Sequence, residues 1–377
     1  MDLLLIIRGL AAISVVVWHA VGYQAGFPFV NIPGRTAVWI FFGISGYVIA
    51  HGFLYQRYLL DRFGLKHFYL NRVLRIYPLF LLLSVLGWLT MWAGSGINPL
   101  KWEDLPSQFF GIQFNHAYKL NGVFWTLGLE IQFYVIAPAL AKLFFISNSQ
   151  RRWTIIFAGY VGSLVFNLFA VLNLGWSADG RNIISVFPHF FIGMVGCGLA
   201  TSLKRSNPRA VAFLVCAAIC LVASNWLYHT QPAWFWSPLG TILVDAMVLS
   251  FIFAHASLAV SLHPPGATHS KLISVFLWMG TLSYGIYAWH AYLMSSFAWV
   301  HANLVALLLA SIASAYVTYR WVELPALKLK RWQGVEGQAE TLEVSPGAPS
   351  PYGGTNSDTR QNTQGYGREI DIDKEKP

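Results

Sequence analysis

The chain has 377 residues, of which 56% are hydrophobic and only 11% are charged, and its mean hydropathy is +0.51. This composition excludes a soluble globular domain and predicts a protein that crosses the membrane many times. The three cysteines lack the spacing of a disulfide framework or a metal site, so we expect no bound metal. The net charge of +9 is unevenly divided: residues 1–331 hold 21 basic and 8 acidic residues, whereas residues 332–377 hold 4 and 8.

Ten apolar segments are long enough to span a bilayer. They lie near residues 3–22, 36–55, 76–93, 122–145, 154–174, 183–203, 210–228, 239–262, 272–299 and 302–322. We therefore predict an all-α, polytopic transmembrane helix bundle of about ten spans over residues 1–331. Residues 332–377 are rich in Gly, Pro, Ser, Thr, Asn and Gln, and we predict that they form a disordered cytoplasmic tail because they cannot bury enough apolar surface to fold.

The basic residues outside the spans predict the orientation of the chain. With the N-terminus in the cytoplasm, four of the 21 basic residues in 1–331 fall outside and Arg8 lies within a span, which leaves sixteen on the cytoplasmic side. This distribution satisfies the positive-inside rule. We expect an integral membrane protein with both termini in the cytoplasm. The four outside residues are Arg35, Lys101, Lys119 and Arg181.

The first apolar segment carries two ionisable residues, Arg8 and His19. Because Arg8 interrupts the apolar run and no basic residue precedes it, we expect a retained helix rather than a cleaved signal peptide. On a helix the two residues lie ~16 Å apart. An arginine at that depth costs ~3 kcal/mol or more, so it should face the protein interior and find a partner. Alternatively, Arg8 extends to the near interface and His19 bonds a neighbouring helix.

Two further motifs lie in the second span and just before the third. Ser45 and Gly46 are adjacent small residues, which let helices approach closely, so we interpret them as a packing site. Arg72 and Arg75 are three residues apart and share one face of a helical turn, where both could bind one phosphate, with Lys66 nearby. The alternative is that this basic segment holds anionic lipid head groups.

The fourth span contains Glu130 in the stretch from Trp125 to Tyr134. Since this span is entered from outside, Glu130 is expected at a depth similar to that of His19. There it could accept a hydrogen bond from one ring nitrogen and stabilise the imidazolium that forms when the other takes a proton. The alternative is a structural ion pair between Glu130 and Arg8 or Arg35. Before this span, residues 94–121 form the longest outward loop, a candidate lid or cavity rim.

The ninth span places Ser283, Tyr287 and His290 on one helical face. His290 is a second acid or base, a substrate ligand, or a histidine satisfied within the bundle. Near the end of the last span, Glu323 is interpreted as a structural pair with Arg320. Asp245 and Arg181 are weaker candidates for the same cavity.

Taken together and in order, these motifs resemble the acyltransferase 3 family over roughly residues 1–325. The resemblance rests on six motifs. They are Arg8 and His19 separated by ten residues, Phe-Phe-Gly-Ile-Ser-Gly over 41–46, Arg-Val-Leu-Arg before Ile-Tyr-Pro over 72–78, Trp-Thr-Leu-Gly-Leu-Glu-Ile-Gln-Phe-Tyr over 125–134, Ser-Tyr-Gly-Ile-Tyr over 283–287 and Tyr-Arg-Trp-Val-Glu-Leu-Pro over 319–325. Many members carry an aspartate three residues before the arginine, whereas this chain has Leu5.

The resemblance implies an integral membrane O-acyltransferase without a fused extracytoplasmic domain, located in a bacterial inner membrane. It would move an acyl group, expected to be acetyl, from cytoplasmic acetyl-CoA to a hydroxyl of an envelope or exported polysaccharide or glycolipid. His19 and Glu130 are the expected catalytic residues, and Arg8, Arg72 and Arg75 the expected donor-binding residues. The acyl-CoA is a co-substrate rather than a bound cofactor, and we expect contact with membrane lipid but no nucleic-acid partner. The expected cavity residues are Ser45, Trp125, Tyr134, Ser283, Tyr287 and His290.

Membrane-embedded Arg, His, Glu and Asp residues are also the components of a proton relay, so the competing hypothesis is a proton-coupled transporter or flippase. The sequence lacks the internal repeats and the paired Gly/Pro-interrupted spans that are typical of transporters. A non-catalytic membrane scaffold is a third hypothesis, but it gives the ionisable residues within the spans no role.

Overall fold

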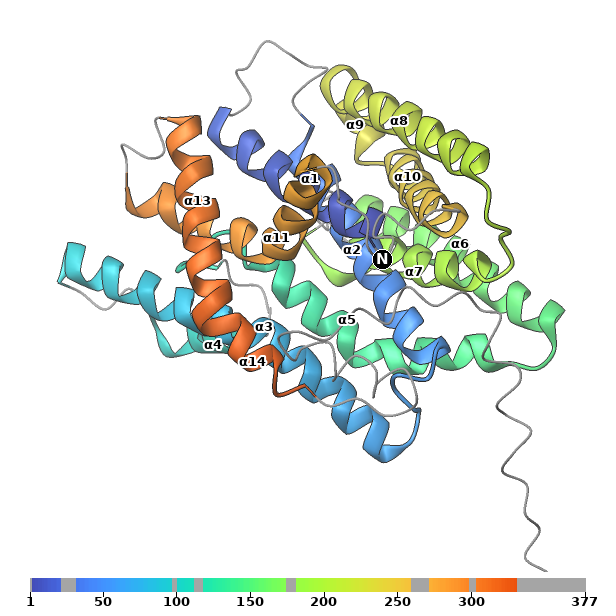
Figure 1. Ribbon diagram of the computed structural model, residues 1–377, viewed down its shortest axis with the longest axis horizontal. Coiled ribbons are helices and arrows are strands. Elements are labelled where there is room, and N and C mark those ends of the chain that lie inside the picture. Colours follow the sequence, from blue (N-terminus) through green and yellow to red (C-terminus); the bar gives the residue numbers. More distant parts are fainter. Residues whose placement is uncertain are drawn as a thin grey trace, which may run out of the picture.

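The structure of the protein is a computed structural model that describes residues 2–21, 32–96, 100–111, 118–173, 181–258, 271–297 and 303–330. Within these ranges the chain is helical and contains no strand (Figure 1). Ten of its helices are long and apolar enough to cross a membrane, which confirms the predicted all-α bundle and its number of spans. The predicted disordered tail, residues 332–377, lies outside the described residues.

Ten long helices follow one another along the chain, and some of them continue into a short turn of another helix type. Two of them are extended in this way: α5 continues into the 3₁₀ turn η3 (Lys142–Phe145), and α13 continues through the π turn η4 (Tyr319–Glu323) into α14 (Leu324–Leu327). The ten are α1 (Asp2–Val21), α2 (Gly34–Leu54), α3 (Arg62–Ser95), α5 (Trp125–Ala141), α6 (Ser149–Asn173), α7 (Ile183–Ala200), α8 (Asn207–Thr230), α10 (Pro238–Ser257), α11 (Lys271–Ser296) and α13 (Leu304–Thr318).

Helices α2 and α7 cross at the centre of the bundle (Figure 1). Glycines make the crossing possible, because a Cβ atom on Gly46 would collide with the carbonyl oxygen of Phe190, and one on Gly193 with that of Gly43. Such close approach is typical of small residues at helix interfaces in membranes. The expected packing role of Gly46 is therefore confirmed, and it fixes the position of the neighbouring Ser45.

The crossing yields a prediction about folding. Gly193→Leu is expected to destabilise the protein, because the new side chain would meet backbone rather than a flexible side chain. Overpacking a well-packed core costs about 1–3 kcal/mol even where neighbours can adjust. Gly162→Leu in α6 is the matched control, since a Cβ atom at Gly162 meets no atom within 4 Å. Thermal unfolding in detergent measures both variants, and equal midpoints would contradict the prediction.

The outer helices turn apolar side chains away from the protein. Along α8, four side chains spaced by three or four residues are between 53% and 64% exposed, and they form one stripe: Val211, Val215, Ile219 and Val222. A helix that spans a bilayer needs no polar outer face, because its surroundings are hydrocarbon. The stripe therefore marks a face of α8 that contacts lipid.

Helix α3 is longer than the sequence predicts. We expected a span at 76–93, but the helix runs without a break over Arg62–Ser95. The Asp61 carboxylate caps its first turn by accepting a hydrogen bond from the Gly64 N–H at 2.6 Å, which supplies a partner for one of the free amides there. The charged first turns are too polar to be recognised as part of a span. Arg72 and Arg75 therefore lie on the same rigid helix as the apolar segment.

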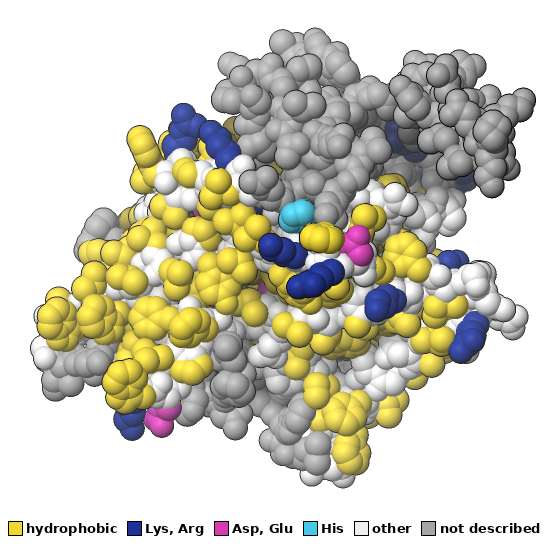
Figure 2. All heavy atoms as spheres, turned by 90° about the horizontal axis from the view of Figure 1, so that it is seen from below, with side chains coloured by type: hydrophobic (Ala, Val, Ile, Leu, Met, Phe, Trp, Pro, Cys, Tyr) yellow, Lys and Arg dark blue, Asp and Glu magenta, His cyan; other side chains and the backbone are white. Residues whose placement is uncertain are grey.

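The end of the molecule at which α3 begins is drawn in Figure 2. Lys and Arg side chains gather near the centre of this face, and hydrophobic side chains occupy much of the rest of the visible described surface. This grouping agrees with the predicted excess of basic residues on the cytoplasmic side of the membrane.

The expected outward loop is only partly described. Residues 100–111 contain the 3₁₀ turn η2 (Trp102–Asp104) and the short helix α4 (Leu105–Phe110), and Trp102 is 88% exposed. Residues 97–99 and 112–117 lie outside the described residues. The prediction of a lid or rim therefore stays a prediction.

Candidate active site

Three cavities follow one another between helices α1, α2, α3, α5 and α11. The arginine cavity, of about 60 Å³, is lined by Arg8, Arg72, Arg75 and Tyr134 among others. The middle cavity, also of about 60 Å³, is lined by Arg8, Phe41, Ser45, Glu130 and Ser283 among others. The histidine cavity, of about 390 Å³, is lined by His19, Arg35, Trp125, Arg181 and Tyr287 among others.

Shared lining residues show that the cavities adjoin. The arginine and middle cavities have Arg8, Ser45 and Glu130 in common. The middle and histidine cavities have Val38 and Tyr287 in common. The predicted site residues other than His290, which come from five separate stretches of sequence, thus surround one row of cavities, whereas His290 is buried and lines none of the three.

Arg72 and Arg75 both line the arginine cavity, but their side chains have different neighbours. The Arg72 guanidinium lies over aromatic rings, 5.4 Å from the centroids of Phe68 and Tyr134. The hydroxyl groups of Tyr58 and Tyr134 also interact with the Arg72 guanidinium. Arg75 instead lies 3.7 Å from a carboxylate oxygen of Glu323.

The partner of Glu323 corrects an expectation. We expected Glu323 to form a structural end-cap pair with Arg320, but its side chain is buried and faces Arg75 on α3. The reason is the π turn over Tyr319–Glu323, which adds a residue to the helical turn and rotates the following side chains. If the regular α-helical period is applied to the sequence, the Glu323 side chain is placed on a different face of the helix from the one that it occupies in the structure.

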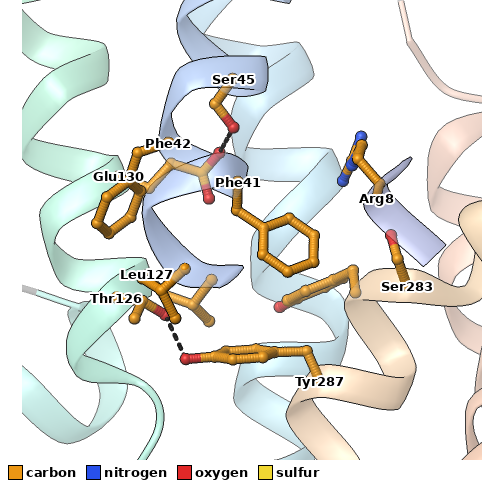
Figure 3. Close-up of a pocket in the computed structure, with 11 residues that line it drawn as sticks. Arg8, Phe41, Phe42, Ser45, Thr126, Leu127, Glu130, Ser283 and Tyr287 are labelled. Carbon is orange, nitrogen blue, oxygen red and sulfur yellow. Dashed lines mark hydrogen bonds between the residues drawn. The ribbon is translucent and has the colours of Figure 1, made fainter. Parts of the chain in front are cut away.

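The middle cavity is built around Glu130. Its carboxylate accepts hydrogen bonds from the Ser45 hydroxyl at 2.8 Å and from the Tyr134 hydroxyl at 2.5 Å. Arg8 lies on the opposite side of the cavity and interacts electrostatically with Glu130 (Figure 3). The charged groups of α1 and α5 therefore face each other across this cavity.

The expected pairing of Glu130 with His19 is wrong. The Glu130 carboxylate is hydrogen-bonded to Ser45 and Tyr134 and lines the same cavity as Arg8. The Nδ1 atom of His19 instead lies 2.9 Å from the Val15 carbonyl oxygen and 3.3 Å from Nε2 of His290. Glu130 lies five residues beyond Trp125, which begins α5 and lines the histidine cavity, so the helix carries Glu130 past His19 rather than beside it. The alternative of an ion pair between Glu130 and Arg8 or Arg35 stays a prediction.

Helix α11 contributes the far wall of the middle cavity, where Ser283 and Tyr287 point inward (Figure 3). The Tyr287 hydroxyl lies 3.0 Å from the Thr126 hydroxyl and donates to the Val123 carbonyl at 3.1 Å. The Ser283 hydroxyl is buried and has no hydrogen-bond partner among the described residues. A buried hydroxyl beside a cavity can serve a polar group of a bound molecule.

His19 is exposed to the histidine cavity at the other end of α1. A carbonyl oxygen only accepts hydrogen bonds, so Nδ1 of His19 carries the proton and donates to Val15. The other nitrogen, Nε2, then has the lone pair and is the basic atom. His290 is fully buried, and its ring lies 5.1 Å from that of His19.

The wall of the histidine cavity contains groups to which sequence reasoning gave little weight. The Arg35 guanidinium lies 4.4 Å from the centroid of the Trp125 ring, and that of Arg181 lies 5.9 Å from the same ring. In the sequence both arginines are exceptions to the positive-inside distribution, Arg181 was a weaker cavity candidate, and Arg35 was considered only as a possible ion-pair partner of Glu130. Both cations therefore lie close to the ring of the expected cavity residue Trp125.

Asp245 was a weaker candidate for the cavity in the sequence, but it lines none of these three cavities. Its carboxylate accepts from the Tyr160 hydroxyl at 2.6 Å and lies 2.7 Å from Nδ1 of His189. His189 is fully buried and its ring stacks on that of Trp39, with the two ring centroids 4.6 Å apart. The sequence could not reveal this cluster because its three polar residues come from α6, α7 and α10.

Comparison with known proteins decides the family. A family model described as an acyltransferase domain matches residues 4–320. The chain belongs to the acyltransferase 3 family. This confirms the resemblance seen in the motifs, and with the ten apolar helices it makes the chain an integral membrane protein with a donor and an acceptor substrate.

Several curated proteins are similar to this acyltransferase 3 chain. O-acetyltransferase OatA of Staphylococcus aureus is 22% identical over 358 residues, covering 85% of this chain and 56% of that protein. The putative acetyltransferase ORF330 of Acidianus two-tailed virus is 25% identical, covering 75% and 80%. Peptidoglycan O-acetyltransferase OatA of Listeria monocytogenes is 23% identical, covering 75% and 48%. The chain thus spans about half the length of the bacterial relatives. No solved structure matches it.

Proposed function

We propose that this acyltransferase 3 protein transfers an acetyl group from cytoplasmic acetyl-CoA to a hydroxyl of an envelope or exported glycan or glycolipid. The observation that carries the proposal is the row of three cavities, with a pair of arginines at one end and a basic histidine nitrogen at the other. The relatives named as O-acetyltransferases support the choice of acetyl.

The charge distribution supports the direction of transfer. With the N-terminus in the cytoplasm, the arginine cavity opens toward the compartment that holds acetyl-CoA, and the histidine cavity toward the opposite side. Arg72 and Arg75 would bind donor phosphates, and the thioester arm would pass Arg8 and Glu130. His19 lies eleven residues beyond Arg8 on α1, so the arm would extend ~16 Å between them.

The chemistry would take place at Nε2 of His19. This nitrogen takes the proton of the acceptor hydroxyl while the oxygen attacks the thioester carbonyl carbon. The C–S bond then breaks, and the departing CoA thiolate recovers the proton from the imidazolium. A two-step relay uses the same atom: Nε2 attacks the thioester carbonyl carbon, the C–S bond breaks and CoA leaves as the thiolate. The acceptor oxygen then attacks the acetyl carbon, the C–N bond breaks, and the hydroxyl proton ends on the CoA thiolate. In both routes the bond from Nδ1 to Val15 holds the ring in the required tautomer.

The direct test compares cells with and without the gene. Envelope glycans from the expressing cells are expected to gain mass in steps of one acetyl group, and hydroxide treatment should remove the gain because the new bond is an ester. Identical glycan masses, with the protein present in the membrane, would contradict the proposed function and favour transport.

The donor site yields a prediction of its own. Arg72→Lys with Arg75→Lys keeps both charges but removes the planar forks that bind phosphate in a bidentate manner. We expect acetyl-CoA to bind the double variant about tenfold more weakly, a loss of about 1.4 kcal/mol. Calorimetry on protein in nanodiscs of neutral lipid measures the affinity and excludes attraction to anionic head groups.

Arg62→Gln is the matched control, because Arg62 lies at the exposed start of the same helix and outside the arginine cavity. This variant should bind acetyl-CoA as the wild type does. An unchanged affinity in the double lysine variant, or an equal loss in Arg62→Gln, would show that the basic segment only attracts anions and that the donor binds elsewhere.

A further inference from the structure

The middle cavity contains two polar groups that the described part of the protein leaves available. The Ser283 hydroxyl is buried on its wall and has no hydrogen-bond partner among the described residues. Glu130 accepts its hydrogen bonds from Ser45 and Tyr134 on the same atom, Oε1. Within the described ranges its other carboxylate oxygen, Oε2, therefore accepts no hydrogen bond. Ser283 and Glu130 lie on opposite walls, so a donor and an acceptor face the space between them (Figure 3).

The other hydroxyls of the cavity wall are already engaged. They donate within the protein: Ser45 to Glu130, Tyr284 to the Ile76 carbonyl, and Thr126 and Tyr287 to the Val123 carbonyl. Among the described lining residues, Ser283 is thus the hydroxyl that remains for a bound molecule. A buried polar group beside a cavity is expected to find its partner in whatever occupies that cavity.

Arg8 restricts the charge of what can enter. Its guanidinium lies on the same side of the cavity as Ser283 and interacts electrostatically with Glu130 on the other side (Figure 3). Because a positive and a negative group face each other, a carboxylate in the cavity would be repelled by Glu130 and an ammonium group by Arg8. The cavity therefore suits an uncharged group that both accepts and donates hydrogen bonds.

Size and position restrict the ligand further. The middle cavity has about 60 Å³ and adjoins the arginine cavity on one side and the histidine cavity on the other. Apolar side chains form much of the rest of its wall, among them Phe41, Phe42 and Leu127. A sugar ring is too large for this space, so the occupant is a segment of a slender chain that continues into both neighbouring cavities.

A secondary amide is the uncharged group of such a chain that accepts at one atom and donates at the next. The pantetheine arm of acetyl-CoA carries two secondary amides, one near the thioester and one near the pantoyl group. An amide that leaves water for an apolar cavity needs hydrogen-bond partners, because its transfer without them is unfavourable. The arm therefore requires the kind of partners that this cavity offers.

We propose that the middle cavity binds a secondary amide of the pantetheine arm. Ser283 and Arg8 donate hydrogen bonds to the amide carbonyl oxygen, and the amide N–H donates to Oε2 of Glu130. This inference rests on the proposed function and names the part of the donor that the cavity recognises. Ser283 is thus a specificity-determining residue that selects donors with an amide in the arm and takes no part in bond making.

The first test examines the protein without a ligand. Ser283→Ala is expected to unfold at the wild-type temperature or slightly above it, because the hydroxyl that it removes is bonded to no described residue. Ser311→Ala is the matched control: Ser311 is equally buried and without a partner among the described residues, but it lines none of the three cavities. A midpoint for Ser283→Ala well below that of Ser311→Ala would show that the Ser283 hydroxyl is bonded inside the protein and would overturn the inference.

The second test measures donor binding by calorimetry in nanodiscs of phosphatidylcholine. Ser283→Ala is expected to bind acetyl-CoA about fivefold more weakly, which corresponds to the loss of one hydrogen bond between uncharged groups. Ser311→Ala should bind it as the wild type does. Two analogues of acetyl-CoA, each with one amide replaced by an ethylene group, then identify the partner. We expect one of them to bind the wild type and Ser283→Ala with equal affinity, because that analogue lacks the group that Ser283 contacts.

The outcomes separate this inference from the proposed function. An unchanged affinity for acetyl-CoA in Ser283→Ala would overturn the inference, and so would an equal loss for acetyl-CoA and both analogues. Either result leaves acetyl transfer from acetyl-CoA intact. If the wild type itself fails to bind acetyl-CoA, the donor of the proposed function is wrong, and the inference is rejected with it.

Discussion

His19→Ala is expected to lower acetyl transfer by about 10²–10⁴-fold, because general-base assistance to the acceptor hydroxyl is of that size. A two-step relay would lose its acyl carrier entirely. The fold should survive, since His19 is exposed to the histidine cavity and its ring nitrogen contacts only Val15 and His290 among the described residues. Turnover of acetyl-CoA by purified protein in nanodiscs measures the loss.

His229→Ala is a suitable control for the loss of a histidine, because His229 is exposed at the end of α8 and does not line the cavity. It should retain nearly full activity. His290→Ala is expected to fall between the two, since it removes the buried ring that packs behind His19. Near-normal turnover by well-folded His19→Ala protein would refute the mechanism.

Glu130→Gln is expected to lower turnover by about 10²-fold, which is typical for the loss of one preorganised electrostatic group. The amide keeps the size of the side chain, and its oxygen can still accept from Ser45 and Tyr134. What disappears is the negative charge opposite Arg8, so we expect Arg8 to leave its position beside the path of the thioester arm. The kcat should fall more than the affinity for acetyl-CoA.

Tyr134→Phe separates charge from hydrogen bonding at the same carboxylate. It removes one donor to Glu130 and preserves the charge, so its effect on kcat should be clearly smaller. Thermal unfolding of both variants completes the experiment. If Glu130→Gln fails to insert or unfolds at a much lower temperature, Glu130 only connects helices and has no role in turnover.

The spans were predictable because a membrane imposes a simple rule, about twenty apolar residues for each crossing. The same rule missed the first turns of α3, where Arg62 and its neighbours are polar although the backbone is already helical. The shared face of Arg72 and Arg75 was also predictable from spacing, and both line the arginine cavity. Spacing along one helix needs no knowledge of how helices pack.

Contacts between helices were harder to predict from the sequence. The depth of Glu130 relative to His19 depends on where α5 enters the membrane and how it tilts against α1, and hydropathy gives neither. The partner of Glu323 depends on a single π turn, which no sequence period reveals. The stack of Arg35 and Arg181 on Trp125 joins three distant segments. Each error arises where the result depends on rotation or register between helices.

The narrowness of two of the cavities has a physiological consequence. The arginine and middle cavities, at about 60 Å³ each, have room for a slender chain or a few water molecules. A nucleotide cannot follow its acyl arm through them, and a sugar cannot pass in the other direction. The bilayer can then stay sealed against ions during turnover. Under the proposed function, only the acyl group changes sides, so the cell modifies its exterior without exporting the carrier that activates the group.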